Sequence, residues 1–266
     1  MSINSNDYIK NYYENYDEDG RLGSRHGLVE FLTTMRYIEH YAKRGDRIIE
    51  VGAGTGRYSH ALARQGYTVD AVELVEHNIE IFKKNTQTGE NISITQGNAM
   101  DLSRFADNSY DITLLFGPMY HLYTKEDKLK ALSEAIRVTK PDGIVFVAYI
   151  IIDGCILDDG FKRGHLNISE YIQNGLIDPV TFAAKSEPKE LFDLVRKEDI
   201  DDLMQDFAVS RLHYIATDGY THHIKETLAE MDGATFELYL KYHFAVCERA
   251  DMVGLTNHSL DIFKIV

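Results

Sequence analysis

The residues with the clearest chemical meaning form a glycine cluster that carries an acid at its start. Residues 50–56 read Glu-Val-Gly-Ala-Gly-Thr-Gly and complete a short apolar run. Glycines in this pattern let the backbone turn sharply and approach a ligand closely. A second acid, Glu73, ends the next apolar run, where a carboxylate is able to bind both hydroxyls of a ribose. Together these features predict a nucleoside site at the carboxyl ends of two strands.

The chemistry around this turn narrows the choice of nucleoside. A dinucleotide fingerprint, GxGxxG or GxGxxA, requires a small residue where this chain has Arg57. Glu50 is unfavourable beside a pyrophosphate but suits a ligand with a positive end, such as the amino group and sulfonium of S-adenosylmethionine. The residues therefore favour S-adenosylmethionine over a nicotinamide or flavin dinucleotide. An NAD(P)-dependent oxidoreductase remains the alternative.

Further candidates follow a later apolar run and lie near the N-terminus. Residues 117–121 read Gly-Pro-Met-Tyr-His and leave the predicted ligand edge of the sheet, so we expect Tyr120 and His121 in a substrate pocket. A histidine takes up a proton near neutral pH, which makes His121 a candidate catalytic base, with a structural loop role as the alternative. Tyr13 and Arg21 are expected to close a lid over the cofactor or to pack a terminal helix.

The other histidines and the cysteines predict no metal site. The histidines at issue are His222, His223, His243 and His258. They lack carboxylates or cysteines at ligand spacing, so solvated or core positions are expected. Cys155 and Cys247 form no CxxC pair and are expected to be reduced and inert, as in a cytoplasmic protein.

Alternating strands and helices must position these residues. We expect strands at 47–51, 68–73, 92–96, 111–116, 144–152, 207–216 and 259–266, and helices at 58–65, 75–85, 124–139 and 235–249. The pattern predicts an α/β fold with a doubly wound, mostly parallel, seven-stranded Rossmann-like sheet and helices on both faces. One domain is expected: a helical cap (1–45), a cofactor-binding core (46–152), a helical insertion without a clear strand (153–205) and the rest of the sheet (206–266).

Residues 47–150 resemble the class I S-adenosylmethionine-dependent methyltransferases, in a generic small-molecule subgroup. The resemblance is carried, in family order, by the segments IIEVGAGTGRYS, TVDAVEL, QGNAMDL, YDITLLFGPMYHL and RVTKPDGIVFVAY. It implies a glycine turn under the methionine part of the cofactor, with Glu73 on the ribose and Leu74 on the adenine. Many relatives have Asp where this chain has Asn98. The cofactor-binding residues expected are Glu50, Gly52, Ala53, Gly54, Thr55, Gly56, Glu73, Leu74, Asn98, Ala99, Leu115 and Phe116, with Tyr13 and Arg21 from the N-terminal cap.

Composition bears on the methyl acceptor. The net charge of -14 and the pI of about 5.2 argue against a nucleic-acid partner, which needs a basic face, and against anionic membranes. No apolar signal core begins the chain, and the longest apolar run, residues 144–152, is too short to span a bilayer. A small-molecule acceptor and a monomer or homodimer are therefore expected. A non-catalytic S-adenosylmethionine-binding protein is the other alternative.

Overall fold

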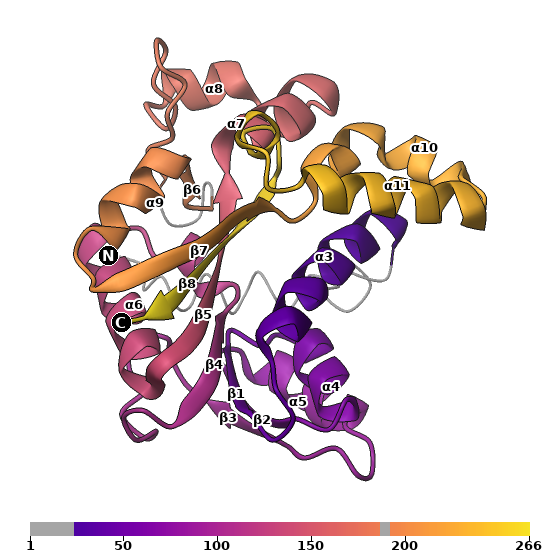
Figure 1. Cartoon of the computed structure of the whole chain (residues 1–266). Helices are drawn as coiled ribbons and strands as arrows, with labels where there is room; N and C mark the ends of the chain where they lie inside the picture. Colours follow the sequence, from indigo (N-terminus) through magenta and orange to yellow (C-terminus); the bar gives the residue numbers. More distant parts are fainter. Residues whose placement is uncertain (1–23, 187–191) are drawn as a thin grey trace.

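The computed structural model describes residues 24–186 and 192–266, and in this part of the chain an eight-stranded sheet forms the centre (Figure 1). Its strands are β1 (Arg47–Val51), β2 (Thr68–Glu73), β3 (Ile92–Gln96), β4 (Tyr110–Leu115), β5 (Thr139–Ile151), β6 (Leu194–Val195), β7 (Val209–Ala216) and β8 (His258–Ile265). The order is β3-β2-β1-β4-β5-β8-β7, and β6 pairs with β5. Strands β1 to β6 pair in parallel, whereas β8 is antiparallel to both neighbours. The predicted doubly wound, mostly parallel sheet is confirmed.

The eighth strand corrects the expectation that residues 153–205 hold no strand. β5 pairs with β4 only as far as Val147, so its last residues lack a partner on that edge. Ile150 and Ile151 pair there with Leu194 and Val195 of β6. Buried backbone N–H and C=O groups without hydrogen-bond partners cost free energy, and the two residues of β6 supply partners for the end of β5. A two-residue strand is too short to produce a detectable hydrophobic pattern.

Helices cover both faces of the sheet. On one face, α6 (Lys125–Val138) and α9 (Lys197–Met204) share a core with the strands. On the other face, α3 (Arg25–Tyr41) and α4 (Arg57–Arg64) do so. The predicted start of α6 is confirmed, because the Thr124 hydroxyl accepts a hydrogen bond from the backbone N–H of Asp127 at 3.1 Å. A further helix, α5 (Glu76–Asn85), lies beside β2 and β3.

The carboxyl edge of the sheet is covered by later segments of the chain. The insertion contributes α7 (Ile152–Cys155), η2 (Ile156–Lys162) and α8 (Ile168–Gln173). Between β7 and β8 come η3 (Gly219–Ile224), α10 (Lys225–Glu230), α11 (Gly233–Val246) and α12 (Ala250–Val253). Val29 of α3 packs on Leu228 and Phe236, so the first described helix and the C-terminal helices lie side by side (Figure 1). Among the described residues, no helix has the length and apolar character that crossing a membrane requires.

Candidate active site

The turn after β1 depends on its glycines for two different reasons. Gly52, Gly54 and Gly56 all have positive φ, at +84°, +54° and +93°. A Cβ at Gly52 would lie 2.1 Å from the carbonyl oxygen of Phe116, and one at Gly56 would lie 2.4 Å from the ring of Phe82. The first and third glycines therefore let the turn pack closely on its surroundings, in addition to permitting its backbone conformation.

Glu73 holds this turn against the end of β2. Its Oε2 accepts a hydrogen bond from the Gly54 N–H at 2.8 Å, and its Oε1 accepts one from the Val75 N–H at 2.9 Å. The side chain is buried, and burial raises its pKa although these hydrogen bonds lower it. The structure thus brings together the two features, turn and carboxylate, that the sequence singled out as a nucleoside site.

A cavity with about 660 Å³ of space, part of it open to solvent, lies over the glycine turn. Of the residues that the sequence predicted for the site, Glu50, Gly52, Ala53, Gly54, Thr55, Phe116 and Tyr120 line it. Sequence reasoning missed the rest of the lining, which is Glu30, Thr34, Arg57, Tyr58, Ala148, Thr217, His258, Ser259 and Leu260. Glu30 and Thr34 are one helical turn apart on α3, and both are buried polar residues. That spacing was the only signal for them in the sequence.

The other predicted site residues lie outside this lining: Gly56, Glu73, Leu74, Asn98, Ala99, Leu115 and His121. Leu115 and Ala99 are buried in the core of the sheet. The Asn98 side-chain oxygen accepts a hydrogen bond from the backbone N–H of Met100 at 2.9 Å, which shapes the loop after β3. Tyr13 and Arg21 lie outside the described residues.

Glu50 gives the cavity an unusual carboxyl group. Its side chain is only 2% exposed, and the Ser59 hydroxyl donates a hydrogen bond to it. Burial raises the pKa of Glu50 to about 8, an effect that the Ser59 hydrogen bond reduces. A cation in the cavity would favour the ionised form of this carboxyl group.

His121 differs from its expected character. It ends the short helix η1 (Pro118–His121), is 8% exposed and lies against the rings of Tyr120 and Phe192, at centroid distances of 5.0 Å and 5.2 Å. Burial lowers its pKa to about 4. Burial beside these rings moves the pKa of His121 below the near-neutral range expected of it, and its role as a catalytic base stays a prediction.

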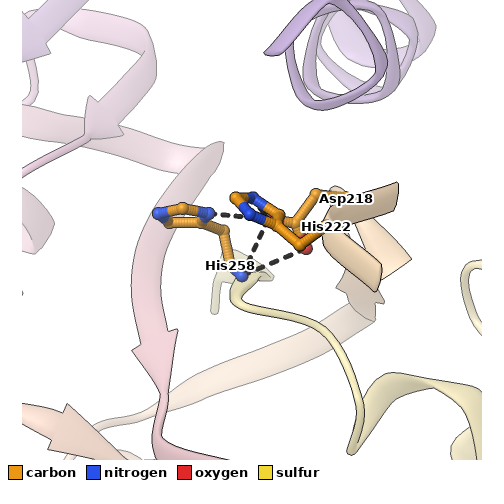
Figure 2. A group of neighbouring side chains, drawn as sticks. All are labelled: Asp218, His222 and His258. Carbon is orange, nitrogen blue, oxygen red and sulfur yellow. Dashed lines mark hydrogen bonds and ion pairs between the residues drawn. The ribbon is translucent and has the colours of Figure 1, made fainter. Parts of the chain in front are cut away.

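A cluster of polar side chains that the sequence did not group together borders the cavity. Asp218 follows β7, His222 lies in η3 and His258 begins β8, and Figure 2 shows the three side chains converging. The ligand atoms of the three all lie within 4.8 Å of one another, close enough to hold a metal ion. Asp218 precedes His222 by four residues, a spacing that sequence reasoning overlooked, and the long β7–β8 connection separates Asp218 from His258. The expectation that these histidines bind no metal ion stays a prediction.

Fold and site together define the class of this protein: a nucleoside-binding Rossmann-like fold with a glycine turn after β1 and a carboxylate at the end of β2. Residues 49–147 match a family model described as a methyltransferase domain. The chain is 30% identical over 184 residues to a glycine/sarcosine N-methyltransferase from Aphanothece halophytica, covering 64% of this chain and 67% of that protein. It is 37% identical over 107 residues to a demethylmenaquinone methyltransferase from Staphylococcus aureus, covering 39% of this chain and 42% of that protein.

A solved S-adenosylmethionine-dependent methyltransferase from Methanosarcina mazei has the same fold. The TM-score is 0.57 at 16% identity, and the match covers 86% of this chain and 97% of the other. The present chain belongs to the class I S-adenosylmethionine-dependent methyltransferases. It is therefore an enzyme that uses S-adenosylmethionine, and the oxidoreductase alternative is set aside.

Proposed function

We propose that this methyltransferase transfers the methyl group of S-adenosylmethionine to a small molecule bound in the cavity over the glycine turn. The observation that carries the proposal is the composition of this one cavity. It is bounded by the turn after β1 and, on its other sides, by polar side chains of α3, η1 and β8.

The residues of the turn fit the cofactor in charge and shape. When bound, S-adenosylmethionine supplies a methyl carbon activated by a sulfonium. The close backbone approach at Gly52 and Gly54 leaves room for its methionine part, and the buried carboxyl group of Glu50 would face its ammonium group. Glu73, held beside Gly54, would bind the ribose hydroxyls. The protein then aligns the acceptor and excludes water, which are the main demands of methyl transfer.

Two further observations support a small acceptor. The relatives named above are described as acting on glycine, sarcosine and demethylmenaquinone, which are all small molecules. A net charge of -14 disfavours a nucleic acid, whose phosphates need a basic surface. The same charge favours neutral or cationic small acceptors over anionic ones.

Calorimetry with S-adenosylhomocysteine tests the cofactor half of the proposal. Glu73→Gln removes the charge that would accept the ribose hydroxyls, and the matched control Glu80→Gln changes an exposed residue of α5. Hydrogen bonds to a charged group contribute about 1.5–3 kcal/mol, so affinity should fall about 10- to 150-fold in Glu73→Gln only. Equal affinities in the two variants would show that the ribose is held elsewhere.

An acceptor screen tests the other half. Purified enzyme with S-adenosylmethionine is incubated with separate panels of small amines, phenols, quinols, proteins and RNA, and S-adenosylhomocysteine formation is measured. We expect turnover with a member of the small-molecule panels. Turnover confined to the protein or RNA panel would contradict the proposal while leaving the family assignment intact.

A further inference from the structure

We propose that Asp218 and His258 form a catalytic dyad in which Nε2 of His258 removes a proton from the methyl acceptor. The inference deepens the proposed function and rests on it, since it assumes that the acceptor occupies the cavity lined by His258. Asp218 acts as the positioning residue. The acceptor class is thereby narrowed to a hydroxyl or amine compound whose nucleophilic atom carries a proton.

Asp218 is placed rigidly behind the histidine. Its side chain is fully buried, and its Oδ1 accepts hydrogen bonds from the Asn257 N–H at 3.0 Å and from the Thr256 hydroxyl. Its Oδ2 lies 2.7 Å from Nδ1 of His258. These bonds hold the carboxylate in one orientation, because both of its oxygens are engaged by segments that meet at the start of β8.

The contact with Asp218 determines which nitrogen of His258 is basic. A carboxylate accepts a hydrogen bond and so places the ring proton of His258 on Nδ1, which leaves the lone pair on Nε2. Figure 2 shows this second ring nitrogen pointing away from Asp218 and His222. His258 lines the cavity together with Glu50 and Tyr120, and its side chain is 23% exposed. His121, in contrast, lies outside the cavity lining and is 8% exposed.

The two carboxylates beside His258 stabilise the imidazolium that proton transfer would form, whereas a protonated His222 opposes it. Glu30 of α3 lies 3.8 Å from Nδ1, and Asp218 lies on the same side of the ring. His222 is the neighbouring cation. Burial lowers its pKa, but the charges of Asp218 and Asp158 and their hydrogen bonds raise it to about 10. His222 thereby keeps Asp218 ionised, while Glu30 adds a second carboxylate next to His258.

The step balances without any further reactant. The acceptor's proton passes to Nε2 of His258, and the electron pair that held it forms the new bond to the methyl carbon. The electron pair of the broken carbon–sulfur bond stays on sulfur. His258 then releases its proton to solvent through the open side of the cavity.

The alternative to the dyad is a divalent cation bound by the same atoms of Asp218, His222 and His258. It would replace the protons on Nε2 of His222 and Nδ1 of His258, both of which now face Oδ2 of Asp218 at 3.1 Å and 2.7 Å. Those distances are hydrogen-bond distances, as the protonated arrangement requires. Metal analysis of the purified protein and assays with a chelator separate the two occupants. Stoichiometric metal whose removal abolishes turnover would overturn the dyad.

The dyad is tested first without cofactor or acceptor. Nitrogen-15 NMR of the histidine rings reports which nitrogen carries the proton, with His258 assigned by loss of its signals in His258→Asn. We expect the Nδ1–H form in the wild type and loss of this preference in Asp218→Asn. A neutral His258 protonated on Nε2 in the wild type would overturn the proposal.

Kinetics supply the second test once an acceptor is known. His258→Asn should lower kcat about 100- to 10,000-fold, the usual range for acid–base catalysis, with S-adenosylhomocysteine affinity changed less than threefold. His40→Asn, at an exposed position near the end of α3, is the matched control and should resemble wild type. Added imidazole should restore part of the lost rate. Wild-type kcat in His258→Asn would refute the dyad, whereas a wild type that does not bind S-adenosylhomocysteine would refute the proposed function and leave the NMR result standing.

Discussion

Substituting Gly52 by alanine measures how tightly the turn packs on the end of β4. The new Cβ would lie 2.1 Å from the Phe116 carbonyl oxygen and 2.5 Å from Cδ of Pro118, both far inside van der Waals contact. Gly66→Ala is the matched control, since Gly66 has a similar φ of +94° and nothing within 4 Å of a Cβ. Both variants share the cost of a positive φ, about 1–2 kcal/mol, and the same effect on the unfolded chain. The difference in free energy of unfolding between the two variants therefore measures the cost of the clash alone.

Overpacking costs about 1–3 kcal/mol, so Gly52→Ala should unfold at a temperature about 2–12 °C below Gly66→Ala. Chemical denaturation gives the free energies of unfolding, and calorimetry gives S-adenosylhomocysteine affinity. Gly66→Ala should bind as the wild type does, whereas Gly52→Ala should lose most of its binding because relief of the clash moves the turn. Equal stability and equal binding in the two variants would refute the close packing described for this turn.

Three further predictions concern charge and capping. The pKa of His222 is about 10, against an ordinary value near 6.5. Its ionic contacts therefore stabilise the fold fully below pH 6.5, and this stabilisation declines as the pH rises to 10. Denaturation at several pH values should show the decline in the wild type and its loss in His222→Gln. Glu50, with a pKa of about 8, should ionise when S-adenosylhomocysteine brings its ammonium group, so calorimetry at pH 6.5 in buffers of different ionisation enthalpy should detect proton release, which Glu50→Gln abolishes. Thr124→Ala should cost about 0.5–2 kcal/mol in chemical denaturation because it removes the cap of α6, and Ser133→Ala, on the exposed face of the same helix, should cost less.

Local sequence determined the strands other than β6, the helices of the core and the glycine turn. Each strand of the core is a short apolar run bounded by glycine or polar residues, and parallel strands place their carboxyl ends at one edge. The proximity of residues 50–56 and Glu73 follows from that geometry. The buried state of Glu50 does not, because it depends on how α4 and its Ser59 pack over the turn.

Only the tertiary structure decided which histidine borders the cavity. His121 and His258 each begin or end an element at the carboxyl edge, and nothing local distinguishes them. Packing of Phe192, from the far end of the insertion, encloses His121 and lowers its pKa. Pairing of β8 with β5 and β7 sets His258 beside Asp218, 40 residues earlier in the chain. The sequence determines the chemical type of each side chain. Segments distant in the chain set the burial of that side chain and its hydrogen-bond partners, and these two properties decide which histidine is able to act as a base.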